Sequence, residues 1–268
     1  MNKIHTPTEY KLQVYGGDLP IASDVDYHPH MLFPYRTYRE GKYKYLVYQV
    51  TPRGKTLRQF ICDLNKPPER TSFRNSFRKR PPVAITTLDL LLRIIDTCDN
   101  LLGSNQLLSQ SHINPDMIWV DYDADNHITV RLLDIMDYDL VDENINESTY
   151  LSPELLGKRR HILYNSPIQK KMSLNRYDTR PSSLSSVYSI GLILYFIVSN
   201  ADPYEGSRVH VDERPSLSGI SPIYSKLIWI ATNANPIGRP TLKEYREAVV
   251  NLNQPTAHKY SCFTQMFS

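Results

Sequence analysis

Residues 184–199 constrain the fold of this chain more than any other segment, because they are apolar almost all the way round a helix. A helix without a polar face cannot lie at a surface, so other elements must cover it on every side. Its longest apolar run, Tyr188 to Val198 with Ser189 as its polar residue, has only eleven residues and is too short to span a bilayer. The segment therefore predicts a buried central helix in a globular, largely helical body.

Two further helices are predicted from spacing and capping. Residues 84–103 carry apolar side chains at helical spacing after Thr86 and Thr87, either of which is a suitable N-cap. Near the carboxyl end, Thr241 and Glu244 have the spacing of a capping box, which predicts the start of a last helix.

Strands are predicted earlier in the chain. Residues 10–15 and 43–50 are rich in aromatic and β-branched side chains, which favour extended structure. Residues 117–121 and 128–133 alternate in polarity around the polar turn 123–126, and this pattern is typical of a β-hairpin.

Length and composition agree with one globular domain. A chain of 268 residues can bury one large core or two lobes that share one, and 41% hydrophobic residues with 19 tyrosines do not describe a disordered chain. The three cysteines, Cys62, Cys98 and Cys262, are odd in number and far apart, so they predict reduced thiols rather than a disulfide framework or a zinc site. The amino terminus lacks the pattern of a signal peptide, so we expect a cytoplasmic protein without a membrane partner.

The charge is unevenly distributed although the net charge is only +3. Residues 66–82 and 158–180 are strongly basic, whereas residues 134–147 are acidic. Two interpretations remain open: the basic segments are solvated loop faces, or they dock on an acidic partner surface or a polyanion. Neither an aromatic stacking platform nor a recognition motif accompanies the basic charge, so a nucleic-acid partner is disfavoured.

The spacing of Asp121, Asp123 and Asp125 imitates the start of a calcium-binding EF-hand loop. Position six of such a loop needs Gly and position twelve a bidentate Glu, but the chain has Asn126 and Leu132 there. The sequence therefore predicts no calcium site, and no other metal site is indicated.

The stretch from Gln110 to Val120, QSHINPDMIWV, resembles the catalytic loop of protein kinases, H-R-D-L-K-P-E-N-I-L-L. In that family the Asp accepts the substrate hydroxyl proton and the Asn holds a magnesium ion. The corresponding positions hold His112 and Met117, and a thioether cannot replace a hard oxygen ligand. If His112 is aligned with the first residue of H-R-D instead, Asn114 takes the position of the base, and an amide cannot accept the proton either. Both alignments predict an inactive site.

Further blocks follow in the order of the kinase family. They are residues 28–61, similar to the run from the loop before strand 4 through the hinge; Leu132–Met136, at the place of D-F-G; Tyr150–Glu154, similar to A-P-E; Ser186–Tyr195, similar to D-x-W-S-x-G; and Asn235–Thr241, similar to N-P-x-x-R-P-T. The blocks stand in the right order over roughly residues 28–252, and the chain resembles a pseudokinase.

The amino-terminal end departs from the family pattern. Only 27 residues precede His28, whereas a kinase needs a G-x-G-x-x-G turn and a strand-borne Lys to hold the phosphates. Gly16 and Gly17 are not followed by the last Gly of the G-x-G-x-x-G motif, so they indicate a tight turn rather than a phosphate loop. Lys11 is a conceivable lysine for binding a nucleotide. At the gatekeeper position Tyr48 narrows any adenine pocket. We expect the phosphate clamp to be absent.

The resemblance implies an α+β, protein-kinase-like fold with a small, truncated, β-rich amino-terminal lobe and a large, mainly helical carboxyl-terminal lobe. The expected boundaries are 1–61 for the reduced amino-terminal lobe and hinge, 62–252 for the large lobe and 253–268 for a carboxyl-terminal tail.

The resemblance also implies structural roles. Glu154 of the A-P-E-like block is expected to form a buried ion pair with Arg239 of the last block. The usual Asp of the D-x-W block is Ser186, which is expected to weaken the hydrogen bonds that brace the catalytic loop. Asp134, at the D-F-G position, is favoured as a turn residue over a magnesium ligand.

The function that the resemblance implies is that of a catalytically inactive protein, not an enzyme, which acts as an interaction or scaffold subunit of a larger assembly. Its partners are other proteins; no small-molecule substrate, cofactor or metal is expected. Two alternatives are a nucleotide-binding regulatory pseudokinase without phosphotransfer and, less favoured, an unorthodox active phosphotransferase. The candidate partner-binding residues lie in the 155–183 and 66–82 segments: Lys158, Arg159, Arg160, Tyr164, Arg78, Lys79 and Arg80.

Overall fold

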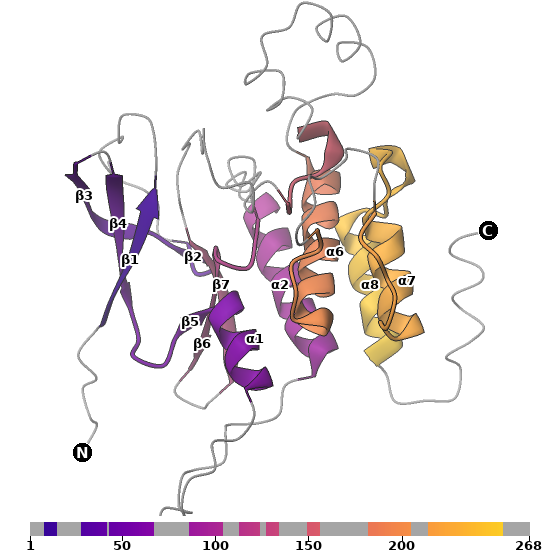
Figure 1. Cartoon of the computed structure of the whole chain (residues 1–268), viewed down its shortest axis with the longest axis horizontal. Coiled ribbons are helices and arrows are strands. Elements are labelled where there is room, and N and C mark those ends of the chain that lie inside the picture. The colour runs from indigo at the N-terminus through magenta and orange to yellow at the C-terminus, as the bar shows by residue number, and fades with distance from the viewer. Residues whose placement is uncertain are drawn as a thin grey trace, which may run out of the picture.

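The structure is a computed structural model of the whole chain. It describes residues 8–14, 28–41, 43–66, 86–103, 113–123, 127–133, 149–155, 182–204 and 214–253. These residues form a mixed α+β fold in which two small sheets lie at one end and a group of helices at the other (Figure 1).

The first sheet has three antiparallel strands in the order β1-β4-β3. They are β1 (Thr8–Val14), β3 (Pro34–Glu40) and β4 (Tyr43–Val50). The turn between β3 and β4 is short, with Glu40 opposite Tyr43, and Gly41 adopts the positive φ of 60° that such a turn requires. Strands at β1 and β4 were predicted from the sequence; β3 was not.

The second sheet has four strands in the order β2-β7-β6-β5. They are β2 (Met31–Leu32), β5 (Lys55–Thr56), β6 (Ile118–Tyr122) and β7 (Ile128–Leu133). Strands β6 and β7 form the predicted antiparallel hairpin, with Val120 opposite Val130, and β2 runs parallel to β7.

The helical segments whose bounds lie in the described part of the chain follow or flank the sheets. They are α1 (Leu57–Asn65), α2 (Thr87–Gly103), α6 (Ser183–Ser199), α7 (Pro222–Ala231), the 3₁₀ turn η2 (Pro236–Gly238) and α8 (Leu242–Asn253). The predicted caps are confirmed: Thr86 accepts from the backbone N–H of Asp89 at 3.1 Å, and Thr241 forms a reciprocal box with Glu244. Within the described chain no helix is long and apolar enough to cross a membrane.

Helix α6 is buried along most of its length, as its all-round apolar sequence predicts, and it packs against α2, α7 and α8 (Figure 1). The large core cluster around it also contains Leu57, Phe60 and Ile61 of α1. Residue 61, where the expected amino-terminal lobe ends, thus lies inside a helix that packs on the helical body.

A smaller cluster joins the two sheets. It consists of Leu32, Leu46, Tyr48, Val50, Met117, Trp119 and Leu133, with Tyr10 packed against it. We call it the intersheet cluster. Side chains of β4 and β6 meet in this cluster. The candidate site lies here.

Candidate functional site

Met117 lies just before β6, and its side chain is buried in the intersheet cluster, only 5% exposed. Its neighbours in this cluster are apolar or aromatic, including Tyr48 of β4 and Leu133 of β7. A thioether among such groups gains from dispersion contacts and presents no charge or hard oxygen to an ion. The position that the kinase motif gives to a magnesium ligand is therefore part of a hydrophobic core.

Trp119 fills the same cluster from β6, and its side chain is 2% exposed. Its ring centroid lies 4.9 Å from that of Tyr10, and burial, followed by the charge of Asp116, raises the pKa of Tyr10 to about 12. A Cβ added at Gly54 would stand 2.3 Å from the indole nitrogen of Trp119, so the backbone between β4 and β5 approaches the indole as closely as only Gly permits.

The loop before β6 is shaped by Asn114. Its side-chain oxygen accepts from the backbone N–H groups of Asp116 at 2.8 Å and Met117 at 3.2 Å, an Asx turn that directs Met117 into the core. The backbone carbonyl of Pro115 accepts from the N–H of Arg58 at 3.1 Å, which ties the loop to the first turn of α1.

Arg58 connects this loop to the end of α6. Its Nε donates to both oxygens of Asp116, at 3.0 and 2.8 Å, and its Nη1 and Nη2 donate to Asp202 at 3.1–3.2 Å. Tyr150 donates its hydroxyl to Asp202 at 2.6 Å, and the guanidinium lies 4.9 Å above the ring of Phe196. Burial acts to lower the pKa of Arg58, but the charge and hydrogen bonds of Asp116, then Asp202, outweigh it and raise that pKa. The carboxylate of Asp116 is thus committed to a structural contact.

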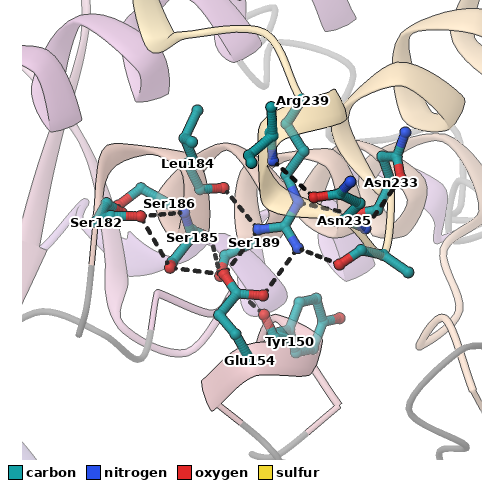
Figure 2. A network of polar contacts seen from close by, with 12 residues as sticks. Tyr150, Glu154, Ser182, Leu184, Ser185, Ser186, Ser189, Asn233, Asn235 and Arg239 are labelled. Carbon is teal, nitrogen blue, oxygen red and sulfur yellow. Dashed lines mark hydrogen bonds and ion pairs between the residues drawn. The ribbon is translucent and has the colours of Figure 1, made fainter. Parts of the chain in front are cut away.

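Arg239 and Glu154 form the expected ion pair, with Nη1 and Nη2 each 2.8 Å from one oxygen of Glu154 (Figure 2). Both side chains are buried, 0% and 2% exposed. The remaining N–H groups of Arg239 donate to the backbone carbonyls of Asn233, Leu184 and Ala234 at 2.7, 3.1 and 3.2 Å. All five donors of the guanidinium are therefore used.

The amino-terminal end of α6 completes this network (Figure 2). Ser185 donates its hydroxyl to Glu154 at 2.8 Å, and Ser189 donates to the backbone carbonyl of Tyr150 at 2.8 Å. Burial acts to raise the pKa of Glu154, but the hydrogen bonds and charge of Arg239 outweigh it and lower that pKa. Ser186, by contrast, donates to the carbonyl of Ser182 at a long 3.4 Å.

Most of the other candidate residues lie outside the described part of the chain. His112 and Asp134 lie outside the described residues, as do the candidate partner-binding residues Lys158, Arg159, Arg160, Tyr164, Arg78, Lys79 and Arg80. Lys11 lies within the described residues, where it is exposed on β1 opposite Val47.

Two of the three carboxylates in the calcium-like stretch, those of Asp121 and Asp123, bind groups of the protein itself, and Asp125 lies outside the described residues. Asp121 is buried and accepts from the Thr51 hydroxyl at 2.6 Å and from the N–H of Tyr122 at 2.7 Å. Asp123 accepts from the N–H of His127 at 2.8 Å. In the part of the chain that the structure describes, no group of three or more His, Cys, Asp or Glu side chains is arranged to hold a metal ion.

Sequence reasoning missed the Arg58 network, because its members, Arg58, Asp116, Asp202 and Tyr150, belong to four separate segments and no local pattern indicates that they meet. It also missed the close approach of Gly54 to Trp119. Comparison with known proteins adds no assignment: no protein-family model and no curated protein matches this chain.

Proposed function

We propose that this chain is a catalytically inactive, protein-kinase-like domain that acts by binding other proteins, as a scaffold or subunit of a larger assembly. The proposal joins the kinase-like order of the sequence blocks to the geometry of the described residues. It assigns residues 1–61, with the three-stranded sheet, β2 and β5, to a reduced amino-terminal lobe with its hinge, and residues 62–252, with the β6–β7 hairpin and the helices from α2 onward, to a large carboxyl-terminal lobe.

The observation that carries the proposal is the burial of Met117. In an active kinase the corresponding side chain is a magnesium ligand and must face the nucleotide phosphates. Here it lies in the intersheet cluster with Tyr48 and Trp119, where no water or ion reaches it without a loss of packing. A gain of metal binding at this position would require both a new side chain and the removal of that core.

The second line of support is a contrast between the catalytic motif positions, which are replaced, and the residues that stabilise the helical body, which are kept. The Glu154–Arg239 network is complete, whereas the motif position of the magnesium ligand holds Met117 inside the intersheet cluster. Residues that hold the helical body together are thus kept, and a residue that would act on a nucleotide is replaced. A rigid framework with variable loops is a common basis for protein recognition.

Thermal unfolding in the presence of ATP with magnesium or manganese tests the absence of a nucleotide site. A nucleotide at about 100 times its dissociation constant would stabilise the fold by roughly 2.7 kcal/mol. We expect no shift relative to the metal alone. A metal-dependent shift would instead support the nucleotide-binding regulator without phosphotransfer.

A phosphotransfer assay separates the remaining enzymatic alternative. We expect no incorporation of labelled phosphate from ATP into the chain or into a general acceptor protein. Metal-dependent incorporation that disappears in an Asp134→Ala variant, purified in the same way, would overturn the proposal, whereas incorporation that persists in that variant would reveal a contaminating kinase.

A further inference from the structure

Strand β3 is an edge of the three-stranded sheet. The order β1-β4-β3 places it last, and within the described residues it pairs with β4 alone. It lies on the side of the molecule away from the helices (Figure 1). Neighbouring residues of an antiparallel strand direct their backbone N–H and C=O groups to alternate sides, so every second residue of β3 directs these groups away from β4. Such an edge is a template for pairing with another strand.

A β-bulge limits the regular part of this edge. The register shifts just before Arg36, and from Arg36 to Glu40 each residue has one partner on β4, in unbroken order. Tyr35, which has no partner in this register, donates its hydroxyl to Glu9 of β1 instead. The regular edge is therefore Arg36–Glu40, and its central residue is Tyr38.

Two opposite charges stand at the ends of this regular edge. Arg36 and Glu40 each lie two residues from Tyr38, so the three side chains share one face of the sheet. Both charged side chains are exposed, and none of the ion pairs in the described residues includes either of them. The guanidinium carbon of Arg36 lies 5.5 Å from the centroid of the Tyr38 ring. Arg36 also acts through its charge on Glu9, whose carboxylate Tyr35 binds.

An antiparallel copy of the same edge complements these charges. In a two-fold pairing centred on Tyr38, the two Tyr38 side chains face each other, and Arg36 of each copy faces Glu40 of the other. Side chains directly opposite each other on paired strands have Cβ atoms about 5 Å apart, and opposite charges there are stabilising. The pairing therefore forms two identical Arg–Glu ion pairs, one on each side of the two-fold axis.

We propose that β3 is a self-association surface on which a second copy of this chain pairs edge to edge, antiparallel and centred on Tyr38, so that two three-stranded sheets join into one. The inference goes beyond the proposed function and uses no part of the kinase resemblance. The regular edge is short, and interfaces of small area are weak or transient. We therefore expect a reversible dimer whose population rises with protein concentration.

Charged residues on an edge strand commonly prevent such pairing, and this alternative has to be weighed against the proposal. Charges of one sign along an edge repel an antiparallel copy at every register. Arg36 and Glu40 have opposite signs at mirrored positions about Tyr38, so in this register they attract a copy.

The other charged residues of the sheet do not oppose this register directly. Glu9 and Lys11 lie on β1, beyond β4, and have opposite signs. Arg39 is on the other face of β3 and would lie diagonal to its own copy, about 7–8 Å away. Residues 42 and 44 are lysines whose side chains lie outside the described part of the chain, and every variant below keeps them.

Complementary charge reversal tests the register. Arg36→Glu leaves acids at both ends of the edge and Glu40→Arg leaves bases at both, so each variant should dimerise at least about tenfold more weakly than the parent. An equimolar mixture of the two variants should recover the dimer, because each acid of one chain then faces an Arg of the other. Sedimentation equilibrium measures the association, and circular dichroism checks that each variant is folded.

Arg39→Glu is the matched control. Arg39 is also an exposed arginine of β3, and the charge change is the same, but the proposed register places it on the other face, opposite Thr37 of the second copy. This variant should dimerise nearly as well as the parent.

A cross-link locates the centre of the pairing without a change of charge. In a chain that carries Cys62→Ser and Cys262→Ser, Tyr38→Cys should form a disulfide between two copies under oxidised glutathione, because directly opposed Cβ atoms lie about 4.5–5.5 Å apart. Thr37→Cys in the same background lies diagonal to its copy and should cross-link much less.

Several results would overturn the inference. They are a parent chain that stays monomeric at every concentration at which it is soluble, folded variants that fail to pair on mixing, equal losses in Arg39→Glu and Arg36→Glu, or preferential cross-linking through Thr37→Cys. Binding of an extended peptide of another sequence at β3, without self-association, would also contradict it. Because none of these measurements involves ATP, the inference and the pseudokinase proposal can fail independently.

Discussion

Arg239 uses every hydrogen-bond donor it has, and this determines how the residue responds to substitution. Its planar fork matches the two oxygens of Glu154 and reaches three backbone carbonyls at the same time. A lysine at this position would keep the charge but has three donors on one nitrogen, so it cannot satisfy both the carboxylate and the carbonyls. Arg239 is therefore a packing element of the fold as much as a charge.

We expect Arg239→Ala to lower the free energy of unfolding by about 3–5 kcal/mol, because it strands the buried Glu154 carboxylate. The matched control is Arg246→Ala, whose ion pair with Asp96 has side chains 43% and 42% exposed and should contribute only about 0.2–1 kcal/mol. Denaturant unfolding followed by circular dichroism measures both. Similar losses in the two variants would contradict the structural role of the buried pair.

The lowered pKa of Glu154 predicts a pH dependence. A carboxyl group with a native pKa below its ordinary value of 4.5 binds fewer protons in the folded state than in the unfolded state. Its contribution to stability is therefore complete well above pH 4.5 and is lost as the pH falls through the lower native pKa.

Glu154→Gln removes this titration, so the difference in unfolding free energy between the parent and Glu154→Gln should shrink on acidification below pH 4.5. Unfolding curves at a series of pH values measure it. A difference that stays constant down to the acid limit of the fold would show that Glu154 does not titrate in the way its contacts predict.

At the scale of elements, α6 and α7 are held close together by Gly191. A Cβ added at this residue would lie 2.6 Å from the Cβ of Ala231 and 3.3 Å from the Cγ2 of Thr232. A Gly→Ala change inside a helix is normally favourable by roughly 1 kcal/mol. Here the clash between two packed helices outweighs that gain.

We expect Gly191→Ala to lower the unfolding free energy by about 1–3 kcal/mol. Adding Ala231→Gly removes the opposing methyl group and should restore part of the loss, with a coupling energy on the order of 1 kcal/mol in a double-mutant cycle. Additive losses in the double variant would mean that the two residues do not meet.

The elements that the sequence predicted are those with a strong local signal. Helix α6 has no polar face, α2 and α8 begin at threonine caps, and the β6–β7 hairpin alternates in polarity around a polar turn. Strand β3 was missed because its sequence, PYRTYRE, shows little apolar alternation, and all its residues after Pro34 are exposed or half-buried. Its stability comes from pairing with β4 across the Gly41 turn rather than from its own sequence.

In the candidate site, only the residues that belong to a sequence motif could be predicted. The motifs pointed to Met117 and to the Glu154–Arg239 pair, since each belongs to a block of several residues in a fixed order. The contact between Arg58 and Asp202 spans 144 residues, and nothing in either local sequence indicates it. The contact of Trp119 with Gly54 likewise depends on how two strands meet, which periodicity does not determine.

At the scale of the whole molecule, the four-stranded sheet separates two cores. Along β6, Ile118 and Val120 belong to the large cluster, whereas Trp119 belongs to the intersheet cluster. The same alternation places Leu132 of β7 on one side and Leu133 on the other. Each core therefore depends on the same strands, and loss of the sheet would expose both.

We therefore expect the described fold to unfold in a single transition. In a Trp229→Phe variant, fluorescence reports Trp119 and thus the intersheet cluster, while far-ultraviolet circular dichroism reports mainly the helices around the large cluster. The two denaturation curves should coincide.

Leu133→Ala removes packing in the intersheet cluster, and Val120→Ala removes packing in the large cluster. In each variant the fluorescence and circular dichroism curves should shift together. For Leu133→Ala we expect the free energy of unfolding to fall by about 2–5 kcal/mol. The comparison is informative because each change removes packing on only one side of the sheet. If Leu133→Ala moved the fluorescence transition alone, the two sheets would form a separately melting unit, and the shared strands would not couple the cores.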